Sequence, residues 1–232
     1  MGAVDLSVLS DADGKPEMDH LLLVGKRLFV GVQRMDRNAW KPEGTSYMAV
    51  VDTGADTIVD CDGATLGLQP VRLDATNPFS EIQMDPAGRG IYVACPGAWG
   101  TVDGGVEMID PDAMTSLGVV LSGAEAGGDI TDVVIVSATK GYVVVTDSNF
   151  HTVLLAFDPE TGQVVGTVYA PGDFVIQDIE QAQNGELFVA DRTPTKPGIR
   201  IYDIDTDAES TAQPIDTGLP PFDITFGSRA RR

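Results

Sequence analysis

The chain has 232 residues, 43% of them apolar, so it is long enough to bury a sizeable hydrophobic core. Its 35 acidic residues outnumber its 15 basic ones, which gives a net charge of −20. That charge argues against nucleic acid or an anionic membrane surface as a partner, because both are bound through Lys and Arg. No apolar run reaches the roughly 18 residues of a membrane-spanning helix, so we expect no membrane insertion. The first residues lack both the basic and the apolar region of a signal peptide.

Most of the acidic excess is Asp, and much of it falls in predicted turns, where Asp can bond its own backbone. We interpret the charge as turn chemistry and solubility, with binding of a hard divalent cation as the alternative. Cys61 and Cys95 are the only cysteines, too few for a zinc site. They are compatible with one disulfide in an exported protein or with two buried thiols.

In chain order, the first predicted element is a strand over residues 4–9, which would end a preceding unit. A repeated pattern then begins at Met18: an acidic residue, an apolar stretch, a glycine-containing turn and a second strand. It returns from Ser80, Thr131 and Gln177 at intervals of roughly 45 to 65 residues. The equivalent positions on the second strand are Phe29, Tyr92, Val143 and Phe188.

After each copy comes a strand that ends in an apolar residue and Asp, then a short turn and another strand. The aspartates are Asp52, Asp110, Asp158 and Asp203. An Asp at the first position of a turn accepts the backbone N–H two residues on, so we interpret all of them as turn formers. The Asp-Thr-Gly triplet at Asp52 is no protease site, because that chemistry needs two facing carboxylates.

Two hairpins per repeat give four strands, which is the blade of a β-propeller. We therefore predict an all-β propeller of about four complete antiparallel blades, over residues 18–75, 76–129, 130–174 and 175–220. Residues 222–226 repeat the start of a blade and, with residues 4–9, are predicted strands of incomplete blades. The sequence thus predicts a partial or truncated toroid.

The loops between the second and third strands should all emerge on one side of the ring, where repeat proteins commonly bind partners. The only two tryptophans, Trp40 and Trp99, lie in these loops, and the later blades place His151 and Arg192 there. We predict that these four residues contact a ligand. The alternative for the tryptophans is that each covers a blade edge.

One acidic residue recurs on the first strand of each unit, and the repeat places all of these acids near one mouth of the central channel. They could hold a cation such as Ca²⁺, since hard cations prefer oxygen ligands. The alternative, which we favour, is that each acid bonds the backbone of the neighbouring blade and ties the ring together. The residues are Asp19, Glu81, Asp132, Asp178 and Asp223.

Two segments, GRGIYVA…VEMIDPDAMTSLG from Gly88 and GYVVVTDSNFHTVLLAFDPETGQVVGTV from Gly141, resemble the YVTN-type (YncE-like) propeller repeats of bacteria. The resemblance extends from about Met18 to Phe226, although the first repeat interval is long and the array is incomplete. It implies a seven-bladed or similar propeller, usually periplasmic, on the cell surface or secreted, and often without known activity.

These observations favour a non-catalytic scaffold that binds a protein or small molecule at one face of the ring, and no cofactor is required. The alternative is a cation-dependent hydrolase of the sugar-lactonase propeller type. The two histidines, His20 and His151, lie in different repeats and form no recognisable catalytic or metal-binding pattern.

Overall fold

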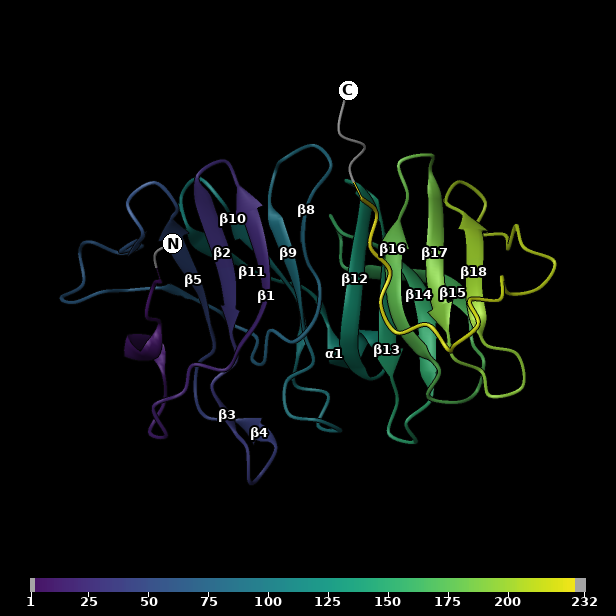
Figure 1. Ribbon diagram of the computed structural model, residues 1–232, viewed down its shortest axis with the longest axis horizontal. Coiled ribbons are helices and arrows are strands. Elements are labelled where there is room, and N and C mark those ends of the chain that lie inside the picture. The colour runs from purple at the N-terminus through teal and green to yellow at the C-terminus, as the bar shows by residue number, and fades with distance from the viewer. Residues whose placement is uncertain (1–2, 228–232) are drawn as a thin grey trace.

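The computed structural model describes residues 3–227, which are almost entirely strands and turns. Four antiparallel sheets follow one another along the chain (Figure 1). Their first strands meet in sequence order: β1 contacts β8, β8 contacts β12, and β12 contacts β16. Sheets joined in this way through their inner strands are the blades of a propeller, as the sequence predicts.

The first blade is the least regular. Its outer edge is shared by two short strands that both pair with β5, and a separate hairpin, β3–β4, projects from the loop after β2. In chain order its strands and the hairpin are β1 (Met18–Val24), β2 (Arg27–Val32), β3 (Met35–Asp36), β4 (Lys41–Pro42), β5 (Tyr47–Asp52), β6 (Thr57–Ile58) and β7 (Val71–Arg72).

The second and third blades each have four strands in sequence order, and a short capped helix, α1 (Gly123–Ala126), joins them. The fourth has three strands, and two isolated bridges take the place of the outer one. The strands are β8 (Ile82–Met84), β9 (Ile91–Cys95), β10 (Gly105–Asp110), β11 (Thr115–Ser122), β12 (Asp129–Ser137), β13 (Lys140–Thr146), β14 (Thr152–Asp158), β15 (Gln163–Tyr169), β16 (Ile176–Gln181), β17 (Glu186–Asp191) and β18 (Gly198–Asp203).

Each inner blade buries both of its faces, because it packs between two neighbours. On β9, Ile91 and Val93 belong to the core shared with the first blade, whereas Tyr92 and Ala94 belong to the core shared with the third. Successive side chains of a strand point to opposite faces, so a continuous apolar run fills two cores at once.

The prediction that the repeated aspartates form turns is confirmed. Asp52 Oδ1 accepts the backbone N–H groups of Gly54 at 2.7 Å and Ala55 at 3.1 Å. The equivalent residues two and three positions on donate in the same way to Asp110, Asp158 and Asp203. Each of these carboxylates therefore closes its own turn.

The predicted strand over residues 4–9 is wrong. Ser7–Leu9 is instead a short 3-10 helix, and Leu6 and Leu9 pack on Val30 and Val32 at the outer face of the first blade. A strand needs a partner edge, and the outer edge of this blade is already paired by β6 and β7. Residues 222–226 are not a strand either, and Ile224 bonds the Asp178 side chain rather than a strand backbone.

Side-chain to backbone bonds tie neighbouring units together. Asp132 Oδ2 accepts the backbone N–H of Ile179 in the next blade at 2.9 Å, and Asp178 Oδ2 accepts that of Ile224 at 2.7 Å. Gln83 Oε1 accepts the N–H of Ile135 at 2.5 Å in the same manner. Asp132 therefore forms the inter-blade bond considered above, and Asp178 forms the corresponding bond to the segment after the fourth blade.

Both cysteines are free thiols. Cys95 is buried in the core between the first two blades, and Cys61 packs at the edge of that core. At the far side of the first blade, β1 leaves Leu21 61% and Leu23 60% exposed, because no further sheet covers them in the part of the chain described.

Replacing Asp132 with Ala should lower the free energy of unfolding by about 1–3 kcal/mol, because the buried N–H of Ile179 loses its acceptor. Urea denaturation measures the change. Asp132→Asn, which keeps one acceptor, should cost less. Asp205→Ala, on an exposed turn, is the control, and an equal loss in that variant would contradict the assignment.

Candidate functional site

A cavity of about 460 Å³ lies where inner strands of the blades meet the C-terminal segment. Its wall combines acidic and aromatic side chains, which come from all four blades and from the segment that follows β18. The lining residues are Asp19, His20, Phe79, Ser80, Glu81, Trp99, Thr131, Phe174, Ile176, Gln177, Asp178, Phe222 and Asp223. We call it the channel cavity.

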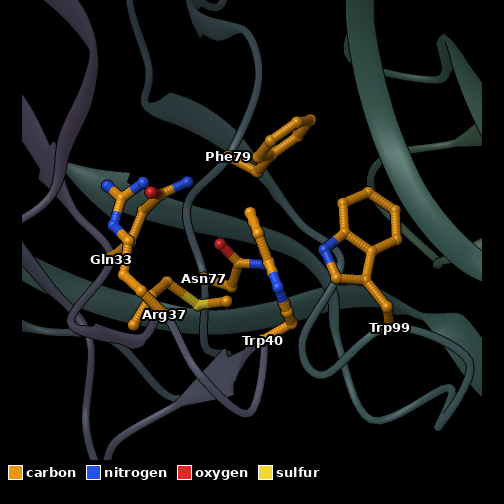
Figure 2. Close-up of a pocket in the computed structure, with 7 residues that line it drawn as sticks. Gln33, Arg37, Trp40, Asn77, Phe79 and Trp99 are labelled. Atoms are coloured by element: carbon orange, nitrogen blue, oxygen red, sulfur yellow. The ribbon is translucent and has the colours of Figure 1, made fainter.

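A smaller cleft of about 100 Å³ adjoins the channel cavity, because Phe79 and Trp99 line both. These two rings meet edge to face, with centroids 5.3 Å apart. Figure 2 shows Trp40 beside Trp99, with Phe79 above them and Gln33 and Arg37 on the other side. The two tryptophans predicted as ligand contacts therefore belong to one continuous aromatic site.

Two residues of the cleft have unusual backbones. Trp40 and Asn77 both lie in the left-handed region, with φ of 52° and 63°. Asn77 is fully buried; its Nδ2 donates to the Gly97 carbonyl at 2.9 Å, and its Oδ1 has no partner among the described residues. Within the described part of the chain, the cleft therefore contains an unpaired hydrogen-bond acceptor, Asn77 Oδ1, and a tryptophan whose backbone conformation is energetically unfavourable.

Two carboxylates that line the channel cavity, Glu81 and Asp178, hold protons more tightly than usual. Burial raises the pKa of Glu81 to about 7, with the negative charge of Glu180 adding to the rise and His20 opposing it. Burial also raises the pKa of Asp178 to about 6, against the stabilising N–H of Ile224. Removing carboxylates from water disfavours their charged form, so Glu81 and Asp178 keep their protons to a higher pH than exposed carboxyl groups do.

His20 is the basic side chain of the cavity wall. Its Nδ1 lies 3.2 Å from Asp19 Oδ1, and this hydrogen bond raises the pKa of His20, while burial opposes the rise. Asp19 also accepts a bond from Gln33 Nε2 at 3.3 Å, which links the channel cavity to the smaller cleft. The pair sits at the rim of the cavity, with His20 exposed.

The predicted acids, Arg192 and His151 differ in whether they line the channel cavity, lie beside it or lie elsewhere. Asp19, Glu81, Asp178 and Asp223 line the channel cavity, whereas Asp132 is 1% exposed and does not. Arg192 lies beside the cavity, with its guanidinium carbon 5.4 Å from the centroid of the Phe222 ring. His151 lies away from both pockets and bonds Asp147 through its backbone N–H at 2.9 Å.

The acids of the channel cavity do not converge as a metal site would. Within residues 3–227, the one trio of carboxylate, histidine or cysteine ligand atoms lying within 4.8 Å of one another is Asp11, Asp13 and Glu17, near the start of the chain. There Glu17 already accepts bonds from Met35 and Arg37. Ca²⁺ binding at the channel remains a prediction.

Sequence reasoning missed the phenylalanines of the site. Phe79, Phe174 and Phe222 each precede a recurring inner-strand acid by one to four residues, which puts an aromatic ring next to a carboxylate. The repeated occurrence of a phenylalanine shortly before the acid was the available signal. Asn77 and Gln33 gave none, because their contribution depends on a cleft formed between two blades.

No family model matches the chain, and no curated protein matches its sequence. Among solved structures, the WD40 β-propeller domain of Doa1 covers 84% of the chain with a TM-score of 0.50 at 14% identity. The chain has a β-propeller fold. This propeller also resembles the extracellular domain of a hybrid two-component system from B. thetaiotaomicron, with TM-score 0.55, 14% identity and 85% of the chain covered. A puromycin hydrolase structure gives a TM-score of 0.54 at 13% identity over 86% of the chain.

The propeller spans 52% of the Doa1 chain, 24% of the two-component protein and 29% of the hydrolase. Likeness at such low identity shows the fold alone, because one fold hosts many unrelated functions. No helix in the described part of the propeller has the length and apolarity needed to cross a membrane.

The raised pKa of Glu81 predicts how stability depends on pH. The folded state binds this proton more tightly than the unfolded chain, so its stabilising effect is full below about pH 4.5 and is lost as the pH rises through about 7. We expect the unfolding free energy to fall between pH 5 and pH 8, and Glu81→Gln to reduce that fall by on the order of 1 kcal/mol. Denaturation at several pH values tests this; an unaltered slope in Glu81→Gln, or the same change in exposed Glu160→Gln, would contradict it.

Proposed function

We propose that this propeller is a non-catalytic binding module that holds a small ligand, free or as part of a protein, in the joined channel cavity and cleft. The observation that carries the proposal is the convergence of both tryptophans and Phe79 on one continuous opening that is lined by all four blades. Aromatic side chains left open around a concave site are typical of ligand contacts, because they bury large area at low entropic cost.

The size and exposure of the site support this. The channel cavity, at about 460 Å³, lies within the usual range of small-molecule sites. Trp40 is 65% exposed although its backbone is in the strained left-handed region. Such a conformation persists only where surrounding structure or a ligand stabilises it. A residue that merely covered a blade edge would be more deeply buried.

The alternative remains a hydrolase of the sugar-lactonase propeller type. The observation that favours it is the pKa of about 7 of Glu81, since a carboxyl that titrates near neutral pH suits proton transfer. Two observations weigh against it: Asp132 is closed off by its bonds to Ile179 and Val133, and Asp178 already bonds Ile224.

We also propose that the protein acts outside the cytoplasm, in the periplasm, at the cell surface or as a secreted protein. The resemblance to YVTN-type repeats supports this, as does the fold likeness to an extracellular domain.

The binding proposal has an internal reporter, because the chain's only two tryptophans both line the site. Titrating a panel of sugars, amino acids, polyamines and short peptides should change tryptophan fluorescence and raise the melting temperature for at least one class. For that class, Trp99→Ala should weaken binding by about tenfold or more, and Trp40→Ala should also weaken it.

Phe150→Ala is the matched control, because Phe150 is an equally exposed aromatic, 65%, on a loop of the third blade that lines neither pocket. Unchanged binding is expected for this variant. If no compound alters fluorescence or melting, or if the Trp99 variant binds as tightly as the parent, the binding proposal fails at this site.

Metal analysis separates the two functions. For a binding module, melting temperature should be the same with Ca²⁺ and with EDTA, whereas a catalytic cation would raise it markedly. A rise with Ca²⁺ that disappears in Glu81→Gln would favour the hydrolase and locate the ion in the channel cavity.

A further inference from the structure

We infer that the ligand of the channel cavity is a small organic cation with an alkylammonium head. This inference rests on the proposed function, and it concerns which chemical class the site selects. It follows from the combination of acidic groups and aromatic rings that line one cavity, together with the shortage of basic groups in its wall.

The charge of the wall is one-sided. Four carboxylates line the cavity, on β1, at the start of β8, on β16 and on the C-terminal segment, and Glu180 adds its charge from β16. Against them, the described residues of the wall include one basic group, His20, which is paired with Asp19. An anionic ligand would be repelled here, whereas a cation would relieve repulsion that the fold already sustains.

The aromatic rings specify an organic cation rather than a bare metal ion. Phe79, Trp99 and Phe174 share the wall with the carboxylates, and the negative faces of such rings attract alkylammonium groups. A metal ion needs several oxygens at close, fixed distances, and the cavity acids form no such trio. Rings and dispersed carboxylates suit a larger, softer cation.

One contact and one polar atom that is unpartnered among the described residues support the same inference. The Arg192 guanidinium already lies over the Phe222 ring, so an aromatic group of this wall accepts a cation in the folded protein. In the adjoining cleft, the free Oδ1 of Asn77 is a buried acceptor that would take an N–H or O–H donor from the ligand's other end.

The test compares two probes of nearly equal shape. Choline carries a quaternary ammonium, and 3,3-dimethylbutan-1-ol replaces its nitrogen with carbon and has no charge. Isothermal titration calorimetry and tryptophan fluorescence should show choline binding at least about tenfold more tightly, which corresponds to roughly 1.4 kcal/mol. Equal affinities would overturn the cation inference while leaving a binding site in place, and binding of neither probe would overturn it too.

A charge-matched pair of variants locates the effect. Glu81→Gln combined with Asp223→Asn removes two carboxylates of the cavity without changing side-chain shape and should abolish the preference for choline. Glu160→Gln combined with Asp205→Asn removes two negative charges from exposed turns and should leave the preference intact. A preference that survives the first pair, or is lost in both, would show that the cavity carboxylates do not recognise the cation.

Affinity for choline should also rise between pH 5.5 and pH 8. Several titratable groups line the channel cavity or lie next to it. They are His20 and Asp19 on β1, Glu81 before β8, buried Asp132 on β12, Asp178 and Glu180 on β16, and Asp223. Across this range Glu81 and Asp178 lose protons, and any proton that His20 loses acts in the same direction, so the wall becomes more negative. Affinity that is constant or falls with pH would contradict the inference.

Discussion

The structure depends on one constraint: a blade has two apolar faces, and each must be covered by a neighbour. β9 and β13 meet this constraint by directing alternate residues into separate cores, so Tyr92 packs toward the third blade while Ile91 and Val93 pack toward the first. Side-chain bonds such as that from the Ile179 N–H to Asp132 then join one blade to the next. The channel cavity exists because inner strands held at these positions leave space between them.

Much of the fold was accessible from the sequence because its repeat has local causes. Asp52 and its equivalents close turns through their own neighbouring N–H groups, so their role follows from a few adjacent residues. The strand predicted over residues 4–9 depended instead on a distant partner. Leu6 and Leu9 are buried, but they pack on a face of the first blade and pair with no strand, because β6 and β7 already hold the outer edge of that blade.

The same distinction holds for the site. Trp40 and Trp99 were found because they stand in equivalent loops, and repetition makes equivalent loops neighbours. The recurring acids were found by their register, yet register could not separate Asp132, sealed by the N–H of Ile179, from Glu81, which faces open space. That difference arises from how two blades meet. The burial of Asn77 and the position of Phe222 on a segment without strand pairing likewise depend on packing between units.

The order of the blades has a further consequence for motion. Contacts pass between sequence neighbours, so the array resembles a one-dimensional chain in which terminal units have fewer supporting interfaces and exchange their amide hydrogens first. The cavity draws one wall from β1, whose outer face leaves Leu21 and Leu23 uncovered, and another from the segment around Phe222. An occupant would therefore contact both the first blade and the segment after the fourth, and filling the cavity would slow local opening of both.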